Sequence, residues 1–396
     1  RGPLAAGRYH PAGNSSTTHA YFGGGENPSI PGSVSTIQRI DYSNDTATAT
    51  PKGLLSQKRS KFSGTGTIDF GYFGGGVIPG FSSTVDRIDY ANDTATAVLR
   101  GTVVERNIDT AAAGTTDFGY QAGGSPKSTV QRIEYATDNA LSVIRGPLSA
   151  ARRYLGGVGN QNYGYFAGGA PGPGYMSTID RIDYSSDTTA AVAKGPLTAV
   201  SQSHGGTGNA NFGYVTGGFN AIPGSNNWIS TVNRLDYTSD TSTTVTKGPL
   251  SVGRSTQSTG TTSYGWSLAG NSSNSTPGML TTVDRIDFSN DTAATAPKGP
   301  LSHTNRQAAG TGNQSYGYNG GGTIIKSLSD IPEKQVIFHP VGSIAIHSGQ
   351  LYHGAAPVYG DTPRYVIVGF MRIDACWISP NAYKISEYRN TYVRIQ

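Results

Sequence analysis

The sequence predicts an all-β protein, and three observations carry that prediction. The first is composition, because 55 glycines and 21 prolines in 396 residues exclude long helices, in whose interior these residues cost about 1 and 3 kcal/mol. The second is a repeat of short strand-like segments between turn residues, which runs through most of the chain. The third is an aromatic content of 10%, which favours an ordered protein over a disordered low-complexity chain.

A short phrase, Lys or Arg followed by Gly-Pro-Leu, opens each repeat and is degenerate in two places. Its glycine recurs at intervals of 45 to 53 residues, and repetition at such a period is typical of solenoids and propellers. The phrase therefore marks seven openings, whose glycines are Gly2, Gly53, Gly101, Gly146, Gly195, Gly248 and Gly299.

Each unit keeps the same internal order. A basic residue follows the opening in every unit except the fifth, and an aromatic residue followed by small residues and glycines comes next. After a variable loop, Ser-Thr-Val or a similar phrase leads into Arg-Ile-Asp-Tyr or a close variant, and then into a turn with Asp. The pattern predicts four short strands separated by turns of Gly, Asn, Asp, Ser and Pro.

Four strands in each repeat are typical of the blades of a β-propeller. A solenoid is the alternative, but antiparallel strands joined by hairpin-length turns favour radial closure. Seven openings stand against six Arg-Ile-Asp-Tyr phrases, so we expect six full four-stranded units and a partial seventh within residues 1–322. We also expect strands from outside the repeat to complete the seventh unit, because its hairpin would otherwise keep open edges.

Several features of the unit resemble the kelch repeat over residues 1–322. They are the aromatic-x-Gly-Gly ending, the later tyrosine after an acidic residue, and the basic residue after Pro-Leu. The chain departs from that pattern by lacking the tryptophan that usually follows the tyrosine. The resemblance implies a kelch-like propeller, a fold that mostly serves as a binding scaffold. The phrase Ser-Thr-Val-x-Arg-Ile-Asp-Tyr-Ser-Asn-Asp-Thr also looks like repeats of virion proteins from marine tailed phages, which implies a decoration, fibre or tail-associated component.

One arginine recurs in the Arg-Ile-Asp-Tyr phrase of every full unit. Strand alternation places Val85, Arg87 and Asp89 on one face, and an arginine between two blades needs a partner. The acid two residues later is the first candidate, and we expect each arginine to be buried and paired with an acid or carbonyls in its own or a neighbouring blade. A ligand-binding ring is the functional alternative, but a copy in every unit favours a structural role for Arg39, Arg87, Arg132, Arg181, Arg234 and Arg285.

The loops after the glycines vary most between units. They occupy equivalent blade positions, so we expect them to crowd one rim of the propeller. Variable loops on a rigid scaffold are where recognition usually takes place, although short insertions there would also be tolerated without a function. The aromatic tips of these loops, Phe81, Tyr175 and Trp228, are the candidate binding residues; the loops are 26–33, 77–81, 170–176, 219–228 and 271–279.

The chain changes character after the repeat, and residues 323–396 are expected to form a small β-rich C-terminal module. Its spacing over about residues 320–371 resembles the end of the jelly roll of a 2-oxoglutarate/Fe(II) dioxygenase. By that resemblance His353 would be the second iron histidine. Arg364 would pair with the far carboxylate of 2-oxoglutarate, a bidentate role that suits a guanidinium group. The implied cofactors are Fe(II) and 2-oxoglutarate.

The dioxygenase chemistry is incomplete in this sequence. Non-haem iron of this kind needs two histidines and one carboxylate, and the first pair should be His-x-Asp or His-x-Glu. None of the seven histidines has an acid two positions later: His10, His19, His204, His303, His339, His347 and His353. We therefore expect no iron, no other cofactor and no catalytic residue in this chain.

Charge and hydropathy narrow the classes of partner that this chain could bind. The net charge is +5 without a basic cluster, which argues against nucleic acid. No apolar run approaches the ~20 residues that span a bilayer, and a single cysteine excludes a disulfide framework. The sequence thus predicts a non-enzymatic structural or recognition protein of a virion or the extracellular space. Its partners would be other particle proteins, or a glycan or protein of a host surface. A dioxygenase with a propeller and a carbohydrate-binding propeller are the alternatives.

Overall fold

The computed structural model describes the repeat region, and every described strand belongs to one compact unit, Arg1–Ser329. The described residues are 4–5, 8–27, 32–44, 47–220, 227–272, 280–298, 301, 309–312 and 317–320. The predicted C-terminal module, residues 323–396 with His353 and Arg364, lies outside the described residues.

Six four-stranded antiparallel sheets form six blades, which confirms the predicted all-β class and the six full units. Blades 1 to 3 contain β1 (Ala12–Ser15), β2 (His19–Gly23), β3 (Thr36–Asp41) and β4 (Thr50–Leu54); β5 (Ser63–Gly66), β6 (Phe70–Gly74), β9 (Thr84–Asp89) and β10 (Val98–Thr102); and β11 (Ala111–Gly114), β12 (Phe118–Ala122), β13 (Val130–Glu134) and β14 (Val143–Arg145). Blades 4 to 6 contain β15 (Gly156–Gly159), β16 (Tyr163–Ala167), β17 (Ile179–Asp183) and β18 (Val192–Lys194); β19 (Gly205–Gly208), β20 (Phe212–Thr216), β21 (Val232–Asp236) and β22 (Val245–Lys247); and β23 (Gln257–Gly260), β24 (Tyr264–Leu268), β25 (Val283–Asp287) and β26 (Ala296–Lys298).

Short elements decorate this frame. A two-residue hairpin of β7 (Val77–Ile78) and β8 (Gly80–Phe81) lies in the variable loop of blade 2. Single 3₁₀ turns follow the third strands of blades 1 to 3: η1 (Tyr42–Asn44), η2 (Tyr90–Asn92) and η3 (Tyr135–Thr137). The described residues contain no α-helix, as the glycine and proline content predicts.

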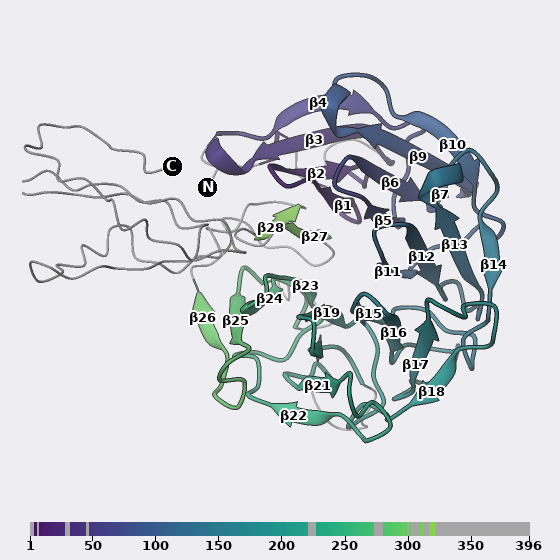
Figure 1. Cartoon of the computed structure of the whole chain (residues 1–396). Coiled ribbons are helices and arrows are strands. Elements are labelled where there is room, and N and C mark those ends of the chain that lie inside the picture. The colour runs from purple at the N-terminus through teal and green to yellow at the C-terminus, as the bar shows by residue number, and fades with distance from the viewer. Residues whose placement is uncertain are drawn as a thin grey trace, which may run out of the picture. The chain divides into compact units, whose positions relative to one another are not determined.

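The first strand of each blade lies at the centre of the propeller, and these inner strands contact one another around a closed ring (Figure 1). A two-stranded sheet of β27 (Ala309–Gly312) and β28 (Gly317–Gly320) stands in this ring between blades 6 and 1. It is the predicted partial seventh unit. Whether further strands complete it falls on residues outside the described ones.

Small residues let the inner strands approach closely. A Cβ atom at Gly157 would lie 2.5 Å from the carbonyl oxygen of Ala112, on the preceding inner strand. At Gly310 of β27 the corresponding distance, to the carbonyl oxygen of Ser258 on β23, is 2.6 Å. The second residue of these inner strands thus faces the backbone of the neighbouring strand, which explains why glycine often stands there.

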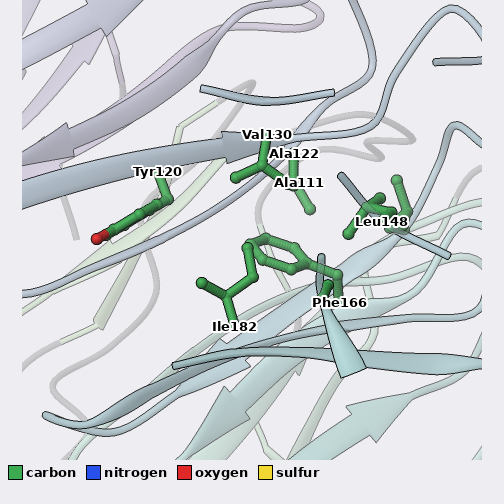
Figure 2. Packing of buried hydrophobic residues seen from close by; sticks show 9 residues of the cluster. Ala111, Tyr120, Ala122, Val130, Leu148, Phe166 and Ile182 are labelled. Atoms are coloured by element: carbon green, nitrogen blue, oxygen red, sulfur yellow. The ribbon is translucent and has the colours of Figure 1, made fainter. Parts of the chain in front are cut away.

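The hydrophobic core lies between adjacent blades. In one cluster, Phe166 and Ile182 of blade 4 are buried with Tyr120 and Val130 of blade 3 (Figure 2). Each such side chain contributes roughly 1.5–3 kcal/mol when it leaves water. Stacked aromatic pairs repeat at five blade interfaces with ring centroids 4.7 to 5.1 Å apart: Tyr21–Tyr90, Tyr72–Tyr135, Tyr120–Tyr184, Tyr165–Tyr237 and Tyr214–Phe288. The tyrosine of the Arg-Ile-Asp-Tyr phrase therefore joins its blade to the preceding one.

Candidate functional site

The connections between strands fall on two faces of the propeller. The loop face carries the connections from the second to the third strand of each blade and those from one blade to the next. Backbone bridges join these two sets of connections, as between Arg153 and Ala170 and between Gln202 and Phe219. The turn face, opposite, carries the other turns. All the variable loops consequently belong to the loop face.

Five of the six repeat arginines form ion pairs with an aspartate from the next blade. The partner is thus an acid of a neighbouring blade, and the first candidate, the acid two residues later on the same strand, is not used: Asp89 accepts the N–H of Ala91 at 2.8 Å and caps its own turn. The arginine side chains are partly rather than fully buried, at 13 to 25% exposed. The guanidinium group reaches across the blade interface rather than along its strand. The pairs, with N–O distances of 2.7 to 2.9 Å, are Arg39–Asp93, Arg87–Asp138, Arg132–Asp187, Arg181–Asp240 and Arg234–Asp291.

Each of these aspartates accepts several donors. Asp187 binds the hydroxyl of Tyr120 at 2.7 Å and Nη1 of Arg132 at 2.9 Å, and its other oxygen lies 3.2 Å from Nε of Arg145. Burial and the bond to Asp187 raise the pKa of Tyr120. Because the chain's own groups occupy the carboxylate in five blades, the network joins neighbouring blades, which favours a structural role over a ligand site. The sixth arginine, Arg285, lies over the ring of Tyr264 at 4.3 Å.

A second set of arginines, the basic residues that follow Gly-Pro-Leu, forms ion pairs that sequence reasoning missed. The side chains of these pairs are fully buried: Arg59–Asp86, Arg152–Asp180 and Arg254–Asp284. Burial lowers the pKa of each arginine while its aspartate opposes that shift. The signal was available, because the residue before the repeat arginine is Asp in units 2, 4 and 6 and Gln or Asn in units 1, 3 and 5.

The candidate aromatic residues are not all brought together. Phe81 stands on β8 of blade 2 and is 45% exposed. Tyr175 and Trp228, from loops of blades 4 and 5, both contact Phe219, with ring centroids 5.8 and 4.8 Å from its own. Phe219 was missed as a site residue by sequence reasoning because Phe219 is the first residue of its loop and only residues at the loop tips were selected. We call Tyr175, Phe219 and Trp228 the aromatic cluster.

The aromatic cluster is accessible at its edges. All three side chains are partly exposed. The indole Nε1 of Trp228 is buried and has no hydrogen-bond acceptor among the described residues. An indole N–H usually finds a partner when it is buried, and the described part of the chain offers this one none.

The turn face has fewer features of a binding site than the loop face. A shallow hollow of about 250 Å³ lies between the inner strands of blades 3 and 4 and is lined by residues 112–114, 158–161 and Tyr184. Burial raises the pKa of Tyr184, and no acid or base lines the hollow. Across the described part of the chain, no three His, Cys, Asp or Glu residues stand where they could hold a metal ion. Nor does that part contain a helix able to cross a membrane.

Comparison with known proteins extends only to the fold. No family model matches the sequence, and no curated protein matches it. Among solved structures, one described as "Structure of YjhT" is similar with a TM-score of 0.59 at 10% sequence identity. The match covers 75% of this chain and 99% of that chain. At this identity the likeness shows a shared β-propeller fold and nothing about activity.

Proposed function

We propose that this chain is a non-enzymatic recognition protein that binds its partner on the loop face, at the aromatic cluster. The observation that carries the proposal is the convergence of Tyr175, Phe219 and Trp228 from the loops of two neighbouring blades. Tyrosine and tryptophan dominate binding energy at interfaces because they bring a large apolar area together with a polar group.

The scaffold beneath this cluster supports the proposal. Ion pairs and stacked aromatic rings tie each of blades 1 to 5 to the blade that follows it, so these blades hold their loops in fixed relative positions. A loop on a rigid frame loses little conformational freedom when it binds, which favours affinity. Among the described residues, no three His, Cys, Asp or Glu side chains stand close enough to hold a metal ion on either face.

The same proposal places the protein on a virus particle, where its partners are other particle proteins or a glycan or protein of the host surface. The support is the resemblance of the repeat phrase to those of phage virion proteins. Mass spectrometry of purified particles from an infected culture tests this placement. We expect the chain among the particle proteins, and its recovery only from the unassembled fraction would contradict the placement.

Binding is tested with the full-length chain, labelled and applied to a panel of bacterial strains. We expect Trp228→Ala and Tyr175→Ala each to reduce cell-bound label at least about tenfold, because hot-spot aromatics contribute 2 kcal/mol or more. Phe81→Ala is the matched control, since Phe81 is an exposed aromatic of another blade on the same face. An equal loss of cell-bound label in all three variants, or no loss in any of them, would show that the aromatic cluster is not the binding site.

The enzymatic alternative is decided on the same protein. We expect no succinate when the full-length chain is incubated with Fe(II) and 2-oxoglutarate. Succinate production that His353→Ala abolishes would move the dioxygenase function to first place.

A further inference from the structure

Five residues adopt left-handed backbone at the same place in blades 1 to 5. Each stands two positions before its inner strand, with φ between 50° and 62°. This conformation costs a residue with a side chain about 1–2 kcal/mol, and glycine avoids the cost. The chain uses 55 glycines, yet it places His10, Lys61, Asp109, Tyr154 and Ser203 here. We call these five residues the polar ring.

The polar ring runs along the centre of the loop face through blades 1 to 5. Backbone hydrogen bonds link neighbouring members within blades 1 and 2 and within blades 3 to 5: the N–H of Lys61 donates to the carbonyl of His10 at 3.2 Å, and that of Ser203 donates to the carbonyl of Tyr154 at 2.9 Å. The N–H of Tyr154 donates likewise to the carbonyl of Asp109, at 3.3 Å. All five residues are partly exposed, and the inner strands they precede surround the axis (Figure 1).

The side chains of the polar ring differ where the rest of the unit repeats. The arginine, tyrosine and aspartate positions that join the blades hold the same residue type in nearly every unit. The polar ring instead carries an imidazole, an ammonium, a carboxylate, a phenol and a hydroxyl group. A role common to all blades would favour one residue type. Five different groups, kept despite backbone strain, fit the recognition of an asymmetric ligand.

Charges around the polar ring balance. Glu26 lies 3.7 Å from Nδ1 of His10 and accepts the hydroxyl of Ser60 at 2.9 Å. Burial raises the pKa of Asp109, and the positive charges of Lys61 and Arg153 oppose that shift. Two carboxylates and two cations therefore share this surface, with hydrogen-bond donors and acceptors interleaved.

This chemistry selects among ligand classes. Because the charges balance, the surface has no excess of positive charge to favour a phosphate or another anion, and the described residues give no three-ligand metal set. Interleaved donors and acceptors beside the ring of Tyr154 suit a neutral polyhydroxylated molecule. Its hydroxyl groups both donate and accept hydrogen bonds, and its apolar faces lie against aromatic rings.

We propose that the polar ring binds a neutral carbohydrate at the centre of the loop face. The aromatic cluster adjoins it, because the N–H of Gln202, the chain neighbour of Ser203, donates to the carbonyl of Phe219 at 2.9 Å. An oligosaccharide therefore meets both surfaces, with one unit at the polar ring and a further unit at the aromatic cluster. This inference rests on the proposed recognition function and names the ligand class for the same face.

The test uses the full-length chain on an array of neutral hexose and N-acetylhexosamine oligosaccharides, with uronic-acid and sulfated glycans for comparison. We expect neutral glycans to bind, and Lys61→Gly and Asp109→Gly each to lose at least tenfold in signal. Both variants relieve backbone strain, so their Tm should stay unchanged or rise. Ala269→Gly is the matched control, because it relieves a left-handed residue (φ 47°) of blade 6 outside the polar ring; it should keep full binding.

The outcomes separate this inference from the proposed function. A fall in Tm for Lys61→Gly and Asp109→Gly means that these side chains are structural and overturns the inference. Full binding by both variants, or binding of the charged glycans alone, overturns it too. If Trp228→Ala loses cell binding while the polar-ring variants keep both cell and glycan binding, the recognition function is supported and the polar ring is not the carbohydrate site. Asp109→Asn, which preserves shape, replaces Asp109→Gly if the glycine variant fails to fold.

Discussion

At the scale of single residues, the buried arginines show how charge is balanced unit by unit. In blades 2, 4 and 6 the arginine after Gly-Pro-Leu meets an aspartate, and both side chains are fully buried. Blades 3 and 5 replace the buried arginine with Asn107 and Ser201 and the acid with Gln131 and Asn233. In blades 2 to 6 the buried arginine and its aspartate are therefore either both present or both replaced by neutral residues, because an unpaired buried charge is costly.

Blade 1 breaks this rule and gives a prediction. Arg8 is 2% exposed, and its Nη1 donates to the carbonyls of Gly24 and Thr36, but neutral Gln38 stands where the acid would be. Burial lowers the pKa of Arg8 to about 10. We expect Gln38→Asp to raise the free energy of unfolding by about 1.5 to 3 kcal/mol, the contribution of a charged hydrogen bond, and the Tm by a few degrees.

Thermal unfolding followed by circular dichroism measures the effect of Gln38→Asp. The control is Gln38→Asn, which makes the same change of length without the charge. A stability gain shared by both variants, or a loss with Asp alone, would contradict the pairing argument.

At the scale of the blade, sequence periodicity predicts the strands and not their partners. Turn residues and alternation are local, so the four strands of each unit and the partial seventh could be predicted from the sequence. The acid that pairs with Arg87 is Asp138, in the next unit, and periodicity does not show which units touch or through which turn. For the same reason, the sequence does not predict which part of the neighbouring blade the opening glycine contacts. The N–H of Gly146 donates to the carbonyl of Asp187 at 2.9 Å, in the turn of the following blade.

That contact makes the opening glycine sensitive to any side chain. A Cβ atom at Gly146 would overlap the carbonyl oxygen of Thr189, which belongs to backbone and cannot rotate away. We expect Gly146→Ala to lower the free energy of unfolding by more than about 3 kcal/mol, the range of severe overpacking. Chemical denaturation measures it. Gly13→Ala is the comparison, since the nearest atom to its Cβ would be a side-chain carbon at 3.2 Å. An equal loss for both would refute the overlap argument.

At the scale of the whole molecule, the ring explains what the sequence could and could not predict about the site. The variable loops could be assigned to one rim because they occupy equivalent positions in the unit. The convergence of Tyr175 and Trp228 on Phe219 could not be predicted from the sequence, because it depends on which two blades are neighbours. The polar ring was also hidden, since Lys61 and Tyr154 are not residue types that mark left-handed backbone. Both surfaces exist only when the units are arranged around one axis.

The ring also predicts how the propeller fails. If β27 is an integral seventh member, a side chain at Gly310 must push against the carbonyl of Ser258, 2.6 Å from its Cβ position, and open the ring between blades 6 and 1. We expect Gly310→Val to lower the Tm of the whole propeller in a single cooperative transition, much as Gly206→Val does inside a four-stranded blade. Thr246→Val, on the outer strand of blade 5, should change little because Thr246 is exposed. Differential scanning calorimetry distinguishes the cases: a neutral Gly310→Val beside a damaging Gly206→Val would mean that the two-stranded sheet rests on the ring without closing it.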